Sequence, residues 1–171
     1  MQTGEFRLRY LFVFLIAIII EIMPTDIPMK IDIVNINAVS DRTLIGYVDE
    51  ATNEKDRLYD AVTSVGTSMK IYTLLENDRM TIQGRVLPFD EGDSVNLGIN
   101  IPSEGTYTIA IAAIDGLFLG QDIFLKDNNQ AITHNIKEAP YVFSSVSGTF
   151  DDRFKLILSE TFTIELVLME V

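Results

Sequence analysis

The sequence predicts an all-β protein, an antiparallel β-sandwich of jelly-roll type, and three observations carry that prediction. Short runs rich in β-branched and aromatic residues recur about every 8 to 12 residues along most of the chain. The segments between these runs are rich in Gly, Asn, Asp and Pro, which supply the backbone dihedrals of tight turns. No stretch after residue 30 keeps a helical period for three turns.

The predicted strands follow one another closely from residue 29 onward. The first, over 29–37, alternates isoleucines loosely with Asp32 and Asn35, as expected of a strand with one buried face. The further runs of this kind are 43–49, 68–75, 79–87, 94–100, 106–114, 121–127, 131–136, 141–147, 153–159 and 162–169. Only 51–62 has the composition of a helical turn. Because there is no internal repeat and no linker, we expect one domain over residues 29–171.

Residues 1–28 form a short apolar N-terminal extension. Arg7 and Arg9 precede an unbroken apolar run over 10–20, which is the arrangement of a secretory signal. Glu21 ends the run well short of the roughly 20 apolar residues that a bilayer requires, so we expect no stable membrane span. No Ala-x-Ala-like cleavage site follows. A short anchor, a buried first strand or a mis-started reading frame are therefore alternatives to the signal.

Charge and composition exclude several classes of protein. The chain carries 13 Lys and Arg against 25 Asp and Glu, a formal net charge of −12. Such a charge repels phosphate backbones, so we expect no nucleic-acid partner. An apolar fraction of 47% is too high for a disordered acidic tail. The absence of cysteine removes disulfides, thiolate metal sites and cysteine nucleophiles, and it is compatible with export.

The sequence shows no complete catalytic constellation. The single histidine, His134, lies in a predicted strand whose alternation places Ile132 and Ile136 on the same face. A hydrolase triad would have only this one base, and the G-x-S-x-G motif of a nucleophile elbow is missing. We therefore expect His134 to be a packed or hydrogen-bonded strand residue, and we expect the protein not to be an enzyme.

One loop carries enough side-chain oxygens for a calcium site. Its candidate ligands are Asp49, Asn53, Asp56 and Asp60. Calcium prefers oxygen ligands of this kind, although the residue order of a regular calcium-binding loop is missing. A second acidic loop spans 90–93. The plainer interpretation is that these acids are solvated, with Asp56 paired to Arg57 or Arg85.

Five stretches of the chain resemble, in order, one known module. They are IGYVDEATNEKDRLYDA, MTIQGRVLPFDEGDSVNLG, GTYTIAIAAIDGLF, QDIFLKDN and ITHNIKEAPYVFSSVSGTFDDRFKLILS. Together they are similar to the β-sandwich module just upstream of the C-terminal sorting domain in adhesin-like, type IX secreted surface proteins of Bacteroidota. The match runs from about Leu44 to Ser159. The resemblance implies a non-catalytic spacer, present here as a fragment without the sorting tail, and it transfers no ligand or catalytic residue.

Four residues in the matched motifs are expected to be structural: Arg85, Phe89, Arg153 and Phe154. Arg153 is predicted to bond Asp151, Asp152 or a turn carbonyl, and so to keep a hairpin over 141–158 in register. Phe89 is predicted to be buried, so that its replacement by alanine costs about 3 to 5 kcal/mol.

The function predicted from these features is that of a non-enzymatic structural or adhesive spacer in a secreted or cell-surface bacterial protein. Its partners would be the neighbouring domains of a longer surface protein. One alternative is a carbohydrate-binding jelly roll with a polysaccharide partner, although the chain has no Trp for stacking on sugars. A second alternative is an adhesion module stabilised by calcium at the loop described above; otherwise we expect no cofactor.

Overall fold

The structure is a computed structural model, and it describes residues 28–87, 92–114 and 116–160 of the 171-residue chain. This part consists of β-strands joined by turns and of one short 3-10 helix, η1 (Gly116–Gly120), so the all-β prediction is confirmed. The strands are β1 (Met29–Asn35), β2 (Ser40–Val48), β3 (Ala61–Val62), β4 (Lys70–Leu75), β5 (Asp78–Val86), β6 (Ser94–Ile101), β7 (Gly105–Ala113), β8 (Gln121–Asp127), β9 (Ile132–Asn135), β10 (Tyr141–Ser145) and β11 (Gly148–Glu160).

Three predictions fall outside the described residues. They concern the signal-like segment within 1–28, of which only Pro28 is described, the buried position of Phe89, and the strand over 162–169. No helix in the part of the chain that the structure describes is long and apolar enough to cross a membrane.

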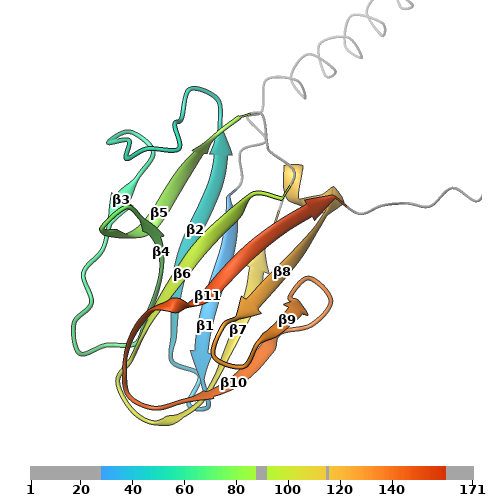
Figure 1. Cartoon of the computed structure of the whole chain (residues 1–171). Coiled ribbons are helices and arrows are strands. Elements are labelled where there is room, and N and C mark those ends of the chain that lie inside the picture. The colour runs from blue at the N-terminus through green and yellow to red at the C-terminus, as the bar shows by residue number, and fades with distance from the viewer. Residues whose placement is uncertain (1–27, 88–91, 115, 161–171) are drawn as a thin grey trace, which may run out of the picture.

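The strands form one curled sheet with the order β10-β7-β1-β2-β5-β4-β6-β11-β8-β9, and β3 attaches to β5. The sheet curls so far that its two terminal strands approach each other, which gives a nearly closed, barrel-like shape (Figure 1). The ring of His134 in β9 lies 5.5 Å, centroid to centroid, from the ring of Tyr141 in β10. The described strands therefore surround one core, and a division into two separate sheets is not shown.

One pair departs from the antiparallel pattern, because β2 and β5 run parallel through Leu44–Val48 and Ile82–Val86. The first residues of β5 pair with β4 instead, so β5 passes from one neighbour to the other along its length. Asp41 of β2 lies in the resulting gap between β2 and β4, where its Oδ2 accepts the amide of Ile71 at 2.9 Å. The hydroxyl of Thr43 in β2 lies 3.3 Å from the Met80 carbonyl of β5 and so also links these two strands.

The predicted hairpin over 141–158 is wrong. β10 pairs with β7, whereas β11 pairs with β6 and β8, so the two strands lie on different parts of the sheet. The link between them is short, and the chain leaves it through Gly148, whose φ of 150° lies outside the region that other residues favour. The predicted turn over 148–152 belongs to β11 itself, as an irregular stretch between Phe150 and Phe154.

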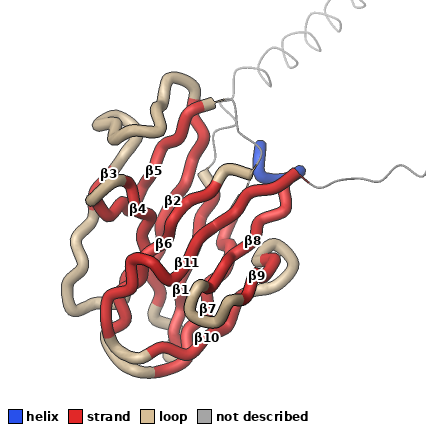
Figure 2. The backbone as a smooth tube through the Cα atoms, in the orientation of Figure 1, coloured by secondary structure: helices blue, strands red, loops and turns tan. Residues whose placement is uncertain are grey.

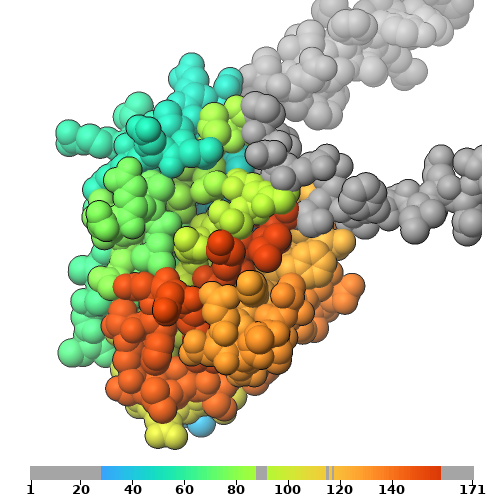
Figure 3. Space-filling model, viewed as in Figure 1, coloured from blue at the N-terminus to red at the C-terminus, as the bar shows by residue number. Residues whose placement is uncertain are grey.

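The core follows the alternation of the sequence. In β1, Met29, Ile31 and Ile33 are fully buried while the residues between them are partly exposed. Leu97 and Ile99 of β6 and the even-numbered apolar residues of β11 face the same core. In the space-filling view the red strand β11 packs directly beside the yellow-green strand β6 on the near face (Figure 3).

The curled sheet has two ends, which we call proximal and distal. At the proximal end β1 and β6 begin and β2, β5 and β11 finish, and at the distal end lie the turns over 36–39, 102–104 and 146–147. Figure 2 shows η1 in blue at the proximal end, beside the start of β8.

Candidate functional site

Three similar polar clusters lie in the described part of the chain, two of them largely buried and one closer to solvent. In each cluster one aspartate carboxylate is shared by an arginine and a tyrosine hydroxyl from other strands or loops. The clusters are Arg153–Asp127–Tyr141, Arg85–Asp93–Tyr47 and Arg79–Asp151–Tyr72.

The Arg153 cluster lies where the two ends of the sheet meet. Arg153 Nη2 of β11 donates to Asp127 Oδ2 of β8 at 3.0 Å and to the Ser144 carbonyl of β10 at 3.3 Å. The Tyr141 hydroxyl of β10 donates to the same carboxylate at 3.1 Å. The arginine and aspartate side chains are only 4% and 0% exposed. Side chains therefore join β10 to β8 and to β11, two strands with which β10 has no backbone pairing.

The surroundings of this cluster are aromatic. The Arg153 guanidinium carbon lies 4.6 Å from the ring centroid of Phe143 and 4.9 Å from that of Phe154, which suits cation–π contact. Burial, together with the charge of Asp127, raises the pKa of Tyr141 to about 12, so its hydroxyl stays a donor at neutral pH. The predicted partners of Arg153, which were Asp151, Asp152 or a turn carbonyl, are wrong, because its ion pair goes to Asp127 of β8 and the carbonyl that it bonds is that of Ser144 in β10.

The Arg85 cluster lies at the proximal end. Arg85 Nη2 donates to Asp93 Oδ1 at 2.7 Å, and Arg85 Nε lies 3.2 Å from the Tyr47 hydroxyl oxygen. The Tyr47 hydroxyl donates in turn to Asp93. Burial, and then the hydrogen bond to Asp93, raise the pKa of Tyr47. The predicted pairing of Arg85 with Asp56 is thus replaced by a pairing with Asp93.

The Arg79 cluster lies closer to solvent. Arg79 Nη2 donates to Asp151 Oδ2 at 2.5 Å, and their side chains are 33% and 42% exposed. The hydrogen bond from Arg79 lowers the pKa of Asp151. Tyr72 donates to Asp151 at 2.7 Å and is itself fully buried against Gly98. A Cβ at Gly98 would lie 2.1 Å from Tyr72 Cε2, so only glycine leaves room for the ring.

Two of the calcium candidates, Asn53 and Asp60, lie beside the edge of β5 and accept backbone amides there. Asp60 Oδ1 accepts the Gly84 amide at 2.9 Å, and Asn53 Oδ1 accepts that of Val86 at 3.4 Å. Asp56 Oδ1 accepts the amide of Leu58 within the loop. Asp49 lies in the exposed turn after β2. This arrangement gives the loop a role in covering amides at the edge of β5.

His134 is a strand residue of β9, as the sequence analysis expects. Its Nε2 lies 2.8 Å from the Ala139 carbonyl oxygen, and its ring packs beside that of Tyr141. Within the described ranges, no group of three or more His, Asp or Glu side chains is arranged to hold a metal ion.

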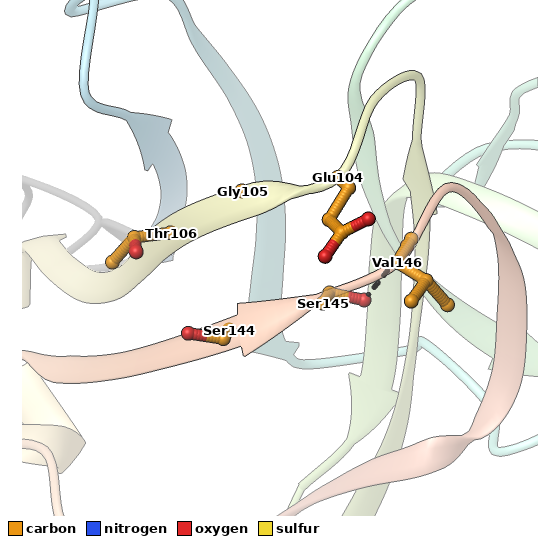
Figure 4. A pocket seen from close by; sticks show the side chains of 6 residues that line it. All are labelled: Glu104, Gly105, Thr106, Ser144, Ser145 and Val146. Carbon is orange, nitrogen blue, oxygen red and sulfur yellow. Dashed lines mark hydrogen bonds between the residues drawn. The ribbon is translucent and has the colours of Figure 1, made fainter.

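A shallow pocket of about 300 Å³ lies at the distal end, between the start of β7 and the end of β10. Its lining residues are Glu104, Gly105, Thr106, Ser144, Ser145 and Val146. Figure 4 shows the Glu104 carboxylate turned toward Ser145, with Thr106 and Ser144 on the neighbouring strands. The lining thus combines one carboxylate with three hydroxyl groups, and none of these residues was singled out from the sequence.

Fold and contacts together describe an all-β module in which two buried arginine–aspartate pairs and one more exposed pair join separate strands and loops, with a small polar pocket at one end. The chain belongs to the family described as Domain of unknown function (DUF8693), whose model matches residues 28–158. That match covers nearly the whole of the described sheet. Searches of curated proteins and of solved structures give no match.

Proposed function

We propose that the chain is a non-enzymatic structural or adhesive module of a secreted or cell-surface bacterial protein. The observation that supports this most directly is the use of its buried charges. Arg153 and Asp127 bond each other, a tyrosine and a backbone carbonyl, so their hydrogen-bonding capacity is directed inward to the fold. A catalytic site would instead need polar groups that converge on a pocket.

The location at the cell surface rests on the resemblance to modules of type IX secreted proteins of Bacteroidota. The family description names no location. The experiment is protease treatment of intact cells of the source organism, followed by immunodetection of this chain. Loss of the signal from intact cells supports the surface location, whereas loss only after lysis contradicts it.

The structural role is tested by thermal unfolding of the full chain with millimolar calcium chloride and, separately, with soluble polysaccharides. A ligand that binds only the folded state raises the midpoint by mass action. An unchanged midpoint in calcium supports a module that needs no metal. A rise that Asp60→Asn abolishes would instead make the loop from Asp49 to Asp60 a calcium site. A rise with one polysaccharide would make the module a recognition domain.

A further inference from the structure

Both described ends of the chain lie at the proximal end of the sheet. Near the end of β11, the Leu158 amide donates to the Asp93 carbonyl at 2.9 Å. Asp93 also accepts the hydroxyl of Tyr47, two residues beyond Ile45, which pairs with Met29 at the start of β1. The start of β1 and the end of β11 are thus close together, as Figure 1 shows. The distal end lies opposite the two described ends of the chain, and we call it the tip of the module.

The pocket lies at this tip and is built on paired strands. Gly105 pairs with Ser145, and Thr106 pairs with Ser144, so the spacing of the lining groups is set by strand register. The Tyr107 hydroxyl donates to the Ser103 carbonyl at 2.5 Å and so fixes the turn that carries Glu104. Side chains on such a frame are held more rigidly than those of a long loop.

The hydroxyl groups of the pocket have hydrogen-bonding capacity to spare. Ser145 is buried and donates through Oγ to the Val146 carbonyl at 3.0 Å, which leaves the lone pairs of its oxygen as acceptors. Ser144 and Thr106 are exposed, and the rotating hydroxyl of each is both donor and acceptor. The Glu104 carboxylate accepts at two oxygens.

This set of groups disfavours anions and calcium. An anion would be repelled by Glu104 and by the net charge of −12. Calcium would require several more oxygen ligands of high charge than this single carboxylate supplies. A neutral ligand rich in hydroxyl groups matches a site with one strong acceptor and two exposed hydroxyls, those of Ser144 and Thr106, that donate and accept. A volume of about 300 Å³ corresponds to the small end of ligand pockets, which suits one sugar ring.

We propose that the distal pocket binds a single sugar residue of a glycan. Glu104 accepts hydrogen bonds from two neighbouring hydroxyls of the sugar, and the exposed hydroxyls of Ser144 and Thr106, which lie on paired residues, bond the remaining ones. The exposed side chain of Val146 contacts the ring. This goes beyond the structural role proposed above, and it depends on the pocket and not on where the protein is located.

The test uses the full chain, labelled with nitrogen-15, and titration with glucose, galactose, mannose and N-acetylglucosamine in separate samples. We expect at least one of these sugars to shift the amide signals of 104–106 and 144–146, with millimolar affinity. If none of the four shifts these signals, the proposal is overturned. A calcium chloride titration runs in parallel, and shifts of the same signals by calcium instead of a sugar would also overturn it.

Variants separate this pocket from binding elsewhere. Glu104→Gln keeps the shape and removes the charge, and we expect it to weaken binding of the sugar about tenfold or more. Thr106→Val keeps the volume, removes a hydroxyl and should weaken binding by less. The matched control is Glu54→Gln, the same change in the exposed loop at the proximal end, which should leave the affinity unchanged. Equal affinities of the Glu104→Gln variant and the control would place any sugar outside this pocket.

Discussion

The Arg153–Asp127 and Arg79–Asp151 pairs contain the same chemical groups in very different surroundings. Each aspartate is shared with a tyrosine, and each arginine lies within cation–π distance of an aromatic ring. The side chains of the first pair are 4% and 0% exposed, whereas those of the second are 33% and 42% exposed. The two pairs therefore differ mainly in the amount of water around them.

Burial, more than pairing itself, therefore decides what each cluster contributes to stability. At the surface, solvent and salt screen an ion pair, which usually contributes about 1 kcal/mol or less. In the interior, removing one partner leaves a charge without compensation, which costs about 3 to 5 kcal/mol. The Arg153 cluster also joins the terminal strand β10 to β8 and β11, with which β10 has no backbone pairing. We therefore expect it to control closure of the sheet.

The largest effect is expected for Arg153→Ala. It leaves Asp127 buried without its counter-ion, and we expect the free energy of unfolding in urea to fall by about 3 to 5 kcal/mol. Removing both charges with Arg153→Met and Asp127→Leu should recover much of that loss, because no unpaired charge remains. A loss below about 1 kcal/mol in the single variant would show that water reaches Asp127.

An intermediate effect is expected for Asp93→Asn in the Arg85 cluster. The side chains of Arg85 and Asp93 are 11% and 17% exposed, between the two extremes. Loss of the charged acceptor should lower the free energy of unfolding by about 1.5 to 3 kcal/mol. The matched control is Asp152→Asn, at an exposed position of β11, which should change stability little. Equal effects of the two variants would contradict the ordering by burial.

A smaller effect is expected for Tyr141→Phe, which removes one donor to Asp127 and should cost about 1 to 2 kcal/mol. The raised pKa of Tyr141 also predicts that the protein loses stability at alkaline pH. This pKa is raised from 10.0 to about 12, so the stabilisation by Tyr141 is complete below pH 10 and is lost as the pH rises toward 12. Urea unfolding across this range should show a steeper loss for the original protein than for the variant. Parallel curves would indicate that Tyr141 titrates normally.

The smallest effect is expected for Arg79→Ala, with a loss of about 1 kcal/mol or less because solvent screens the pair. High salt should shrink even this difference. Since Arg79 lowers the pKa of Asp151 from 3.8, the stabilisation is present above that pH and is lost as the pH falls through the lowered value. The variant should lose less stability than the original protein over this acidic range. A loss of 3 kcal/mol at neutral pH would refute the distinction between the two pairs.

Much of the fold could be predicted from the sequence because the alternation of apolar and polar residues along a strand is a local property. Runs such as 29–37 and 121–127 became β1 and β8 with nearly the predicted bounds. The strand β3, of two residues, was missed, because it has no alternation to detect and forms only through pairing with β5. The parallel pairing of β2 with β5 was missed for a related reason: a strand has the same pattern of side chains whatever the direction of its neighbour.

The partners in the ion pairs could not be predicted from the sequence in this way. Asp127 and Asp151 stand at sequence positions that are typical of exposed turns, next to other polar residues. The burial of Asp127 and the partners of both aspartates depend on which strands the curled sheet brings together, across 26 residues for Arg153 and 72 for Arg79. The sequence offered the oxygens of Asn53 and Asp60 as calcium candidates, and it could not show that amides of β5 lie beside them.

The sequence alone specifies the all-β class, most of the strands and the buried face of alternating strands such as β1 and β10, because these follow from the period of two along an extended chain. It also determined the excess of negative charge and the lack of cysteine. Only the tertiary structure decided which arginine meets which aspartate, how the ends of the sheet close, and that Glu104, Thr106 and Ser144 line one pocket. These features depend on contacts between segments far apart in the chain, and their energies depend on burial.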